Sequence, residues 1–361
     1  MQIGIGIGIG IGAAWGVRTT VTYLLGPFVF ATAEAAPMAS PHTETGAVGS
    51  LTVTDTAPIF SVAGGKLAYN AGVSGFVVSP TALARVAGRA VLATVQRTTM
   101  GPDGATAGWG SATTNVGRHH VSLKSAGAIV CRTAGGGADL IGESWPTGAD
   151  IDLACVLRTA GAFFLARVPG ANALYTLYWV DVSLTGPTLY PGFSNADDVG
   201  NADNLRVADL GGSWATDYGI ATDRKATSAN GDTIAHTADC IIEHTITAAT
   251  GVSQELWVRR VDANNGWIVR MDQAGSTIAL IEKVAGVETS RSIAAQTWTN
   301  GVTYRVLVTA EGAAIKTYVA NAPKNSYDGA TNFQEATGGY ASHAGTDLLG
   351  WPRKLAVPNG V

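Results

Sequence analysis

Two aspartates in the segment ADIDLACV are the first candidates for acid–base chemistry. Asp150 and Asp152 stand two residues apart, so a β-strand would place both carboxylates on one face. A pair of suitably spaced carboxylates can hydrolyse a glycosidic bond. However, no glutamate accompanies them in an ExDxE-like triplet. We therefore expect Asp150 and Asp152 to form a turn that leads into a strand, without a catalytic role.

The histidine pair in the segment GRHHV does not have the spacing of a metal site. Adjacent residues of a strand point to opposite faces, so His119 and His120 cannot both bind one ion. The sequence also lacks the GxSxG motif that marks a nucleophilic serine. We predict that the protein is not an enzyme, although a triad assembled from distant segments stays open.

The segment SNADDVGNADN, residues 194–204, is the most polar of the chain and is predicted to be a loop. The side-chain oxygens of Asp197, Asp198 and Asp203 could bind Ca²⁺. The segment lacks the glutamate and the spacing of an EF-hand loop. A solvated loop with Asx turns is the simpler interpretation, and no other cofactor is predicted.

Four tryptophans near predicted loops could stack on the apolar face of a sugar ring. They are Trp109, Trp145, Trp214 and Trp351. Aromatic side chains also fill the space between packed sheets, so core or interface packing is the preferred interpretation.

Three cysteines, Cys131, Cys155 and Cys240, form neither a CxxC motif nor a Cys/His cluster. We expect them to be buried free thiols that pack as small apolar groups. A disulfide between Cys131 and Cys155 is compatible with the sequence, but nothing requires it.

The elements that position these residues are predicted to be β-strands. The chain has 361 residues, of which 46 are glycine and only 14% are charged. Short runs of alternating polar and apolar residues recur from about residue 43, separated by turns that contain Gly, Asn or Pro. Lys and Arg are scattered singly and the formal net charge is −4, which argues against nucleic-acid binding.

The N-terminal sequence IGIGIGIGIG differs from everything that follows it. Its alternation places Ile3, Ile5, Ile7, Ile9 and Ile11 on one face of a strand, with bare glycine backbone on the other. The GxGxxG fingerprint does not fit, because every glycine from position 4 to 16 has an even number. The uncharged runs are too short and too rich in glycine for a spanning helix, and no positive charge precedes them as in a signal peptide. We predict an arm that docks onto another subunit.

Two related halves follow this arm. The segment ACVLRTAGAFFLARV (154–168) aligns with RVLVTAEGAAIKTYV (305–319), and each is typical of a hairpin with a glycine in its turn. We predict an arm and linker at 1–42, a first domain at 43–210 and a second domain at 211–361.

The segment NNGWIVRMDQAGSTIALIEKVAGVETSRS, followed by GVTYRVLVTAEGAAIKTYV, resembles the laminin-G-like, concanavalin A-type jelly rolls. The segments DIDLACVLRTAGAFFLARV and TLYPGFSN resemble a degenerate copy of the same pattern. This resemblance implies an all-β fold of two tandem antiparallel β-sandwiches. The Ile-Gly arm is similar to the N-termini of tailed-bacteriophage virion proteins.

Together the resemblances imply a non-enzymatic structural and adhesive protein of a phage particle, such as a head fibre, decoration or tail-associated protein. The implied partners are other virion proteins through the arm, further copies of the chain and a cell-surface glycan, without a membrane span. Such a protein would be assembled in the host cytoplasm and act on the extracellular particle. The alternatives are a bacterial carbohydrate-binding adhesin and a glycan-degrading enzyme of the same fold.

Overall fold

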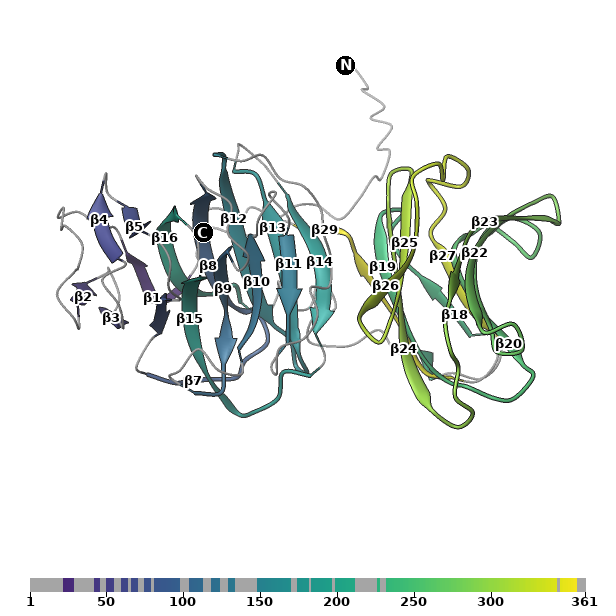
Figure 1. Cartoon of the computed structure of the whole chain (residues 1–361), viewed down its shortest axis with the longest axis horizontal. Helices are drawn as coiled ribbons and strands as arrows, with labels where there is room; N and C mark the ends of the chain where they lie inside the picture. The colour runs from purple at the N-terminus through teal and green to yellow at the C-terminus, as the bar shows by residue number, and fades with distance from the viewer. Residues whose placement is uncertain are drawn as a thin grey trace, which may run out of the picture.

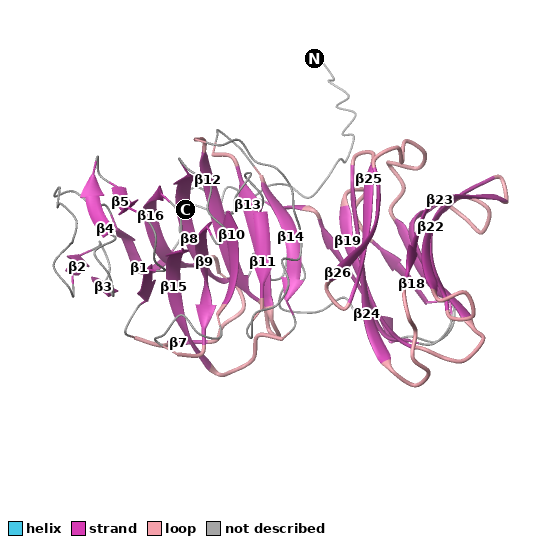
Figure 2. Cartoon of the chain, in the orientation of Figure 1, coloured by secondary structure: helices cyan, strands magenta, loops and turns pink. Residues whose placement is uncertain are grey.

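The described part of the protein is built from β-strands and loops (Figure 2). The computed structural model describes residues 22–28, 42–45, 50–54, 60–63, 66–70, 75–78, 81–97, 104–112, 118–123, 129–133, 148–169, 174–181, 183–196, 199–211, 226–227, 232–342 and 345–355. These residues form two antiparallel β-sandwiches that lie one after the other along the chain (Figure 1). The predicted all-β fold of two tandem antiparallel β-sandwiches is therefore confirmed. Among the described residues, no helix is both long enough and apolar enough to cross a membrane.

The first sandwich contains a nine-stranded sheet with the order β29-β14-β13-β12-β8-β16-β5-β4, and with β1 also paired to β16. Its strands are β1 (Thr22–Phe28), β4 (Phe60–Ala63), β5 (Lys66–Asn70), β8 (Arg89–Arg97), β12 (Asp150–Leu157), β13 (Ala162–Arg167), β14 (Tyr175–Asp181), β16 (Val199–Asp209) and β29 (Lys354–Leu355).

An eight-stranded sheet packs against it, with the order β11-β10-β9-β15-β6-β3-β2 and with β7 paired to β15. Its strands are β2 (His42–Thr45), β3 (Ser50–Thr54), β6 (Gly75–Val78), β7 (Leu83–Ala84), β9 (Gly104–Gly110), β10 (His119–Leu123), β11 (Ile129–Arg132) and β15 (Thr188–Ala196).

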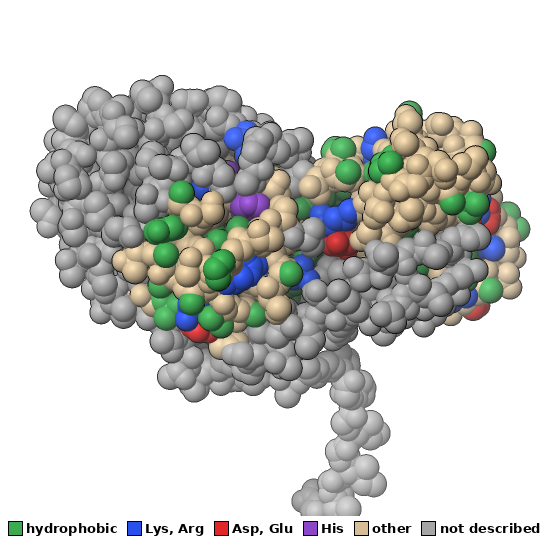
Figure 3. All heavy atoms as spheres, turned by 90° about the horizontal axis from the view of Figure 1, so that it is seen from below, with side chains coloured by type: hydrophobic (Ala, Val, Ile, Leu, Met, Phe, Trp, Pro, Cys, Tyr) green, Lys and Arg blue, Asp and Glu red, His purple; other side chains and the backbone are tan. Residues whose placement is uncertain are grey.

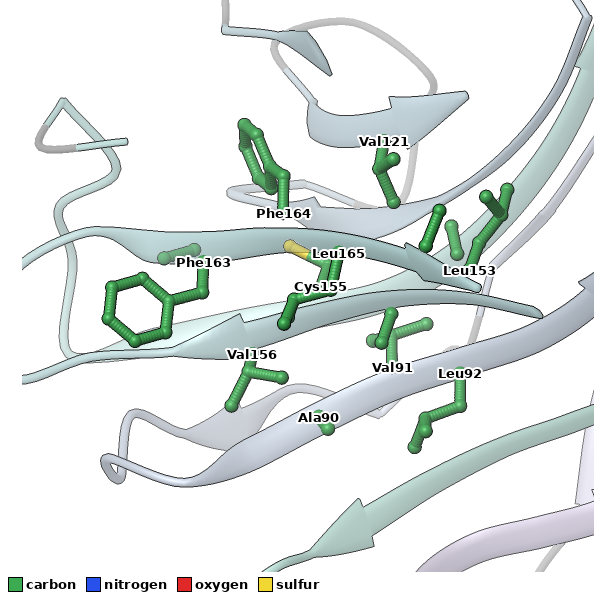
Figure 4. Close-up of a cluster of buried hydrophobic side chains, with 14 of the residues drawn as sticks. Ala90, Val91, Leu92, Val121, Leu153, Cys155, Val156, Phe163, Phe164 and Leu165 are labelled. Carbon is green, nitrogen blue, oxygen red and sulfur yellow. The ribbon is translucent and has the colours of Figure 1, made fainter. Parts of the chain in front are cut away.

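The core of the first sandwich lies between these two sheets (Figure 4). Strand β12 alternates its side chains across the sheet, and Leu153 and Cys155 belong to the buried cluster together with Val121 of β10. The Trp109 indole of β9 donates a hydrogen bond to the Cys155 carbonyl oxygen at 3.0 Å. This bond satisfies a buried donor and fixes the position of one sheet against the other.

The second sandwich has two six-stranded sheets, with the orders β17-β28-β19-β24-β25-β26 and β18-β27-β20-β21-β22-β23. The strand pairs β17/β18, β19/β20 and β27/β28 are consecutive in the chain but lie in opposite sheets, as in a double-sheet jelly roll. The strands of the first sheet are β17 (Ala226–Thr227), β19 (Cys240–Thr247), β24 (Thr303–Glu311), β25 (Ala314–Val319), β26 (Ala322–Tyr327) and β28 (Gly345–Pro352). Those of the second are β18 (Asp232–Ala235), β20 (Ser253–Arg260), β21 (Gly266–Asp272), β22 (Thr277–Val284), β23 (Val287–Ala295) and β27 (Gly338–Ser342).

Strand β29 joins the two sandwiches. It follows β28 of the second sandwich in the chain, yet it pairs with β14 at the edge of the nine-stranded sheet. Leu355 lies opposite Tyr175, and the Leu177 amide donates to the Arg353 carbonyl oxygen at 2.8 Å. The first sandwich is thus completed by residues that come after the second.

Side chains reinforce this junction. The Trp179 and Tyr318 rings meet edge to face, with their centroids 5.5 Å apart. The Arg305 guanidinium lies 5.0 Å from the Trp179 centroid and donates to the Val180 carbonyl oxygen and, at 2.7 Å, to Glu243. Tyr318 therefore belongs to the core cluster of the first sandwich although it lies on β25 of the second.

Three segments differ from the predicted domain bounds and from the predicted polar loop. Residues 22–28, predicted to belong to the arm, form β1 and pair with β16, where the fully buried Phe28 anchors them. Residues 354–355, assigned to the second domain, pair with the first sandwich. The segment 194–204, predicted as a loop, is mostly strand, because β15 extends to Ala196 and β16 begins at Val199.

Candidate functional site

The two aspartates of β12 lie in the strand itself, so the predicted turn is wrong. Strand β12 pairs with β8 from Asp150 and with β13 from Asp152, which extends it over both residues. Asp150 lies 3.2 Å from the Lys66 ammonium. Asp152 accepts hydrogen bonds from Thr94 and from Arg167, each at 2.7 Å. Both carboxylates thus take part in cross-strand contacts on one face of the nine-stranded sheet.

The histidine pair lies on β10 as an alternating strand requires. His119 is buried and contacts Asp181 through Nδ1, whereas His120 is half-buried. Asp181 also accepts hydrogen bonds from the Ser183 amide and hydroxyl, both at 2.7 Å. The serine hydroxyl bonds to the carboxylate and not to the histidine, so this arrangement lacks the nucleophile–base contact of a triad. It joins the end of β14 to the opposite sheet.

The calcium prediction is not tested. Asp197 and Asp198 lie outside the described residues, and Asp203 accepts a hydrogen bond from the Asn204 amide at 2.7 Å. Within the part of the chain that the structure describes, no group of three His, Cys, Asp or Glu side chains is placed to hold a metal ion. The isoleucines of the arm, Ile3 to Ile11, also lie outside the described residues.

At Trp109 the glycan-stacking alternative fails and the preferred interpretation of core packing is confirmed, because the side chain is fully buried in the core of the first sandwich. Trp145 and Trp214 lie outside the described residues. Trp351 stands opposite Ile241 in the pairing of β28 with β19, and nothing is described of its side chain. The position of a tryptophan near a predicted loop was therefore not sufficient to predict that its ring is exposed.

The cysteine prediction is confirmed. Cys131, Cys155 and Cys240 are buried free thiols. Burial raises the pKa of Cys240 to about 12 and that of Cys155 well above its usual value. Both groups are therefore protonated and unreactive at neutral pH.

The surface best suited to bind a ligand lies on the outer face of the β18–β23 sheet in the second sandwich. Trp257 of β20 and Tyr340 of β27 stand opposite one another there, with ring centroids 6.3 Å apart at 85°. Ile268 and Ile281 extend this apolar cluster across β21 and β22. The cluster is separate from the core, which the opposite side chains of the same strands form.

A single glycine positions the tryptophan. A β-carbon at Gly266 would lie 2.9 Å from the Arg260 Cα and 3.2 Å from the Trp257 ring, at a φ of +154°. Only glycine leaves room here for the close approach of β21 to the Arg260 backbone and to the indole. The GW pair of the sequence therefore has a structural reason that the motif alone did not reveal.

Cations cover the two rings. The Arg260 guanidinium lies 4.4 Å from the Tyr340 centroid and 5.5 Å from the Trp257 centroid. The Lys283 ammonium lies 5.4 Å from the Trp257 centroid. As a result Trp257 is 5% exposed, while Tyr340 remains half-buried and reachable from solvent.

A charged cluster borders the aromatic pair on the same face. The Arg270 guanidinium donates to Glu255 at 2.6 and 2.9 Å and to Glu288 at 2.9 and 3.0 Å. The hydrogen bond from Arg270 holds the pKa of Glu288 below its usual value, and the bonds to Glu288 and Glu255 raise the pKa of Arg270. Glu255 is held further by the Trp257 indole, which donates to it at 3.0 Å. We call Glu255, Trp257, Arg260, Arg270, Lys283, Glu288 and Tyr340 the aromatic–charged face.

No protein-family model matches the chain, and no curated protein matches it. In structure the chain is similar to the carbohydrate-binding module CBM66 of Bacillus subtilis, with 16% identity over 36% of this chain and 89% of that chain and a TM-score of 0.29. It is similar to the galectin LEC-6 of Caenorhabditis elegans, with 9% identity over 34% of this chain and 90% of that chain and a TM-score of 0.30. It is also similar to domains LG4-5 of the mouse laminin α1 chain, with 8% identity over 84% of this chain and 95% of that chain and a TM-score of 0.27. At these values the similarities carry no argument about ligand or activity.

Proposed function

We propose that the protein is a non-enzymatic adhesive and structural component of a bacteriophage particle, which binds a surface glycan through the aromatic–charged face. The observation that carries the proposal is the half-buried Tyr340 ring, which Trp257 and Arg260 contact. The Arg270 guanidinium, held by two carboxylates, borders this pair of rings on the same face. Glycan binding and placement on a particle are separate parts of this proposal and need separate tests.

The chemistry of the face suits a sugar ring. A pyranose presents an apolar C–H surface that stacks on an aromatic ring, and hydroxyl groups that need donors and acceptors in a plane around it. Tyr340 supplies the ring, and Trp257 supports it edge on. Arg260 and Lys283 supply donors, and Glu255 and Glu288, which Arg270 holds in place, supply acceptors. These side chains come from a continuous sheet, so little ordering is needed on binding.

Glycan binding is tested with the full chain on an array of bacterial surface glycans, followed by titration of the best ligand. Tyr340→Ala is expected to weaken binding about fivefold, since an aromatic stacking contact contributes on the order of 1 kcal/mol. Tyr340→Phe keeps the ring and should retain most of the affinity. Equal affinities for Tyr340→Ala and the wild type would overturn the assignment of this face.

Placement on a particle is tested through the Ile-Gly arm. A chain that lacks residues 1–21 keeps β1 and its pairing with β16. We expect this shortened chain to fold and to bind glycan, but to be lost from purified particles. A matched variant with Ile3, Ile5, Ile7, Ile9 and Ile11 replaced by serine should be lost as well, because the apolar face of the arm would be gone.

The two alternatives give different results in the same experiments. A secreted adhesin would bind glycan but would not copurify with particles, with or without the arm. A glycan-degrading enzyme would release reducing ends from the bound glycan during the titration. Binding without release, together with arm-dependent incorporation, is the outcome that the proposal requires.

A further inference from the structure

Arg118 differs from two other buried arginines, Arg259 and Arg353, in its hydrogen bonding. Arg259 is fully buried and donates to the Ala238 and Gly312 carbonyl oxygens and to Asp239. Arg353 is 2% exposed and donates to Glu311. Arg118 is 4% exposed, yet its Nε, Nη1 and Nη2 atoms have no hydrogen-bond partner in the described part of the chain.

Two glycines define where the Arg118 side chain lies. Arg118 immediately precedes β10, beside Gly110 at the end of β9. A β-carbon at Gly110 would lie 3.2 Å from the Arg118 Cγ, and one at Gly192 of β15 would lie 2.6 Å from its Cζ. The side chain therefore crosses β9 and lays its guanidinium on the bare backbone of β15. We call this arrangement the Arg118 trough.

The trough lies on the outer face of the eight-stranded sheet. His119 and Trp109 point into the core, so Arg118 and His120 point to the opposite face. Arg132 of β11 stands opposite His120 and is also half-buried. In the view from below, Lys or Arg and His side chains of the first sandwich appear at several separate positions (Figure 3).

No described carboxylate compensates the charge of Arg118. Burial lowers its pKa to about 10, and no neighbouring carboxylate acts against this shift. The group nevertheless stays protonated at neutral pH. A buried guanidinium without acceptors is costly, and its planar N–H groups match the oxygens of a carboxylate, sulfate or phosphate.

We infer that Arg118 anchors an oxyanion-binding site on the outer face of the eight-stranded sheet, where a carboxylate or sulfate group accepts two parallel N–H bonds from its guanidinium. Arg132 adds positive charge on the same face, opposite His120. The site is on the first sandwich and is independent of the aromatic–charged face on the second.

The inference is tested by titrating the full chain, at constant ionic strength, with sulfate, glucuronate and uncharged glucose. Binding is followed by the Nε–Hε resonance of Arg118 in ¹⁵N-arginine-labelled protein and by calorimetry. Sulfate and glucuronate should shift that resonance saturably, and glucose should not. If both anions shift the resonance, the oxyanion that they share is the ligand. If only glucuronate shifts it, the sugar ring contributes to binding as well. Absence of a saturable shift with either anion overturns the inference without any mutation.

Variants separate geometry from charge. Arg118→Lys keeps the charge but loses the planar fork, so anion affinity should fall at least tenfold. Gly192→Ala should weaken binding similarly, because its β-carbon would displace the guanidinium, whereas Gly110→Ala should have a smaller effect. Arg89→Lys, on the same sandwich, is the control and should bind as the wild type does. Unchanged affinity in both Arg118→Lys and Gly192→Ala would show that the anion binds elsewhere.

Discussion

Asp181 illustrates how single residues hold the two sheets of the first sandwich together. Burial acts to raise the pKa of its carboxyl group, but the hydrogen bond and charge of His119, together with the bonds from Ser183, outweigh burial and lower the pKa. A carboxylate whose pKa is lowered on folding stabilises the folded state above its unfolded pKa. That stabilisation is lost as the pH falls through the folded pKa.

Asp181→Asn is expected to lower the free energy of unfolding at pH 7 by about 2 kcal/mol, as for a lost charged hydrogen bond. The difference between variant and wild type should narrow as the pH falls below about 4, where the wild-type carboxyl group also becomes protonated in the unfolded chain. Urea unfolding from pH 7 to pH 3 measures both effects. Asp328→Asn, at an exposed position, serves as the control, and a difference that is constant with pH would contradict the linkage.

His236 gives the second sandwich a pH dependence of the same sign, in a higher pH window. Burial lowers the pKa of His236 below 6.5, and the charge of Arg259 acts in the same direction. Hydrogen bonds to the Thr237 and Gly338 carbonyl oxygens oppose this shift but do not cancel it. The unfolded chain therefore binds a proton first as the pH falls below about 6.5. Stability should fall by up to about 1.4 kcal/mol per pH unit in that window. Unfolding followed at pH 7.5, 6.5 and 5.5 should show this slope in the wild type and a smaller slope in His236→Gln.

At the scale of elements, the hairpins were the features that the sequence predicted well. The segment 154–168 forms β12 and β13 with a turn at Gly161, and 305–319 forms β24 and β25 with a turn at Gly312. Their alternation and turn residues are local signals. The polar segment 194–204 misled the prediction, because backbone pairing with β5 and β8 keeps even Asn201 and Asp203 in a strand.

The candidate site was not predictable for a related reason. Trp257 and Tyr340 come from strands far apart in the sequence, and only sheet order makes them neighbours. Likewise the Arg118 trough depends on Gly110 and Gly192, which belong to different strands. The tryptophans chosen from the sequence were those near turns, and Trp109, the one whose side chain is described, is a core residue.

Strand β29 has only two residues, yet we expect it to contribute strongly to the free energy of unfolding. Leu355 is fully buried in the core cluster of the first sandwich, although only two residues of β29 pair with β14. Leu355→Ala should lower the free energy of unfolding by about 2–4 kcal/mol through the cavity that it leaves. Leu355→Met conserves volume and should cost less than about 1.5 kcal/mol. Denaturant unfolding compares the two, and equal small effects would show that β29 contributes little.

At the scale of the whole molecule, the two sandwiches share a core. Ile241, Leu307 and Tyr318 of the second sandwich belong to the same buried cluster as the first sandwich's Trp179. A shared core couples the unfolding of its parts. The two sandwiches, which lie along the long axis of the molecule, are therefore expected to move as one rigid body (Figure 1).

Calorimetry tests this coupling. We expect the wild-type chain to unfold in a single transition, and Tyr318→Ala to separate it into two, since the loss of the ring removes the contact with Trp179 at 5.5 Å. Tyr327→Ala is the matched control, because Tyr327 packs on Trp267 at 5.7 Å within the second sandwich. This control should lower the transition temperature without splitting the transition. Two transitions in the wild type would contradict a shared core.

The position of β29 has a consequence for how the protein is made. A ribosome synthesises all the other strands of the first sandwich, and then all strands of the second, before it reaches residues 354–355. Until then the edge of the nine-stranded sheet at β14 is open and could pair with another chain. Recombination between genes is limited in the same way. A gene fragment that encodes only one of the two sandwiches would leave the first sandwich without β29. We therefore expect both sandwiches to be exchanged together.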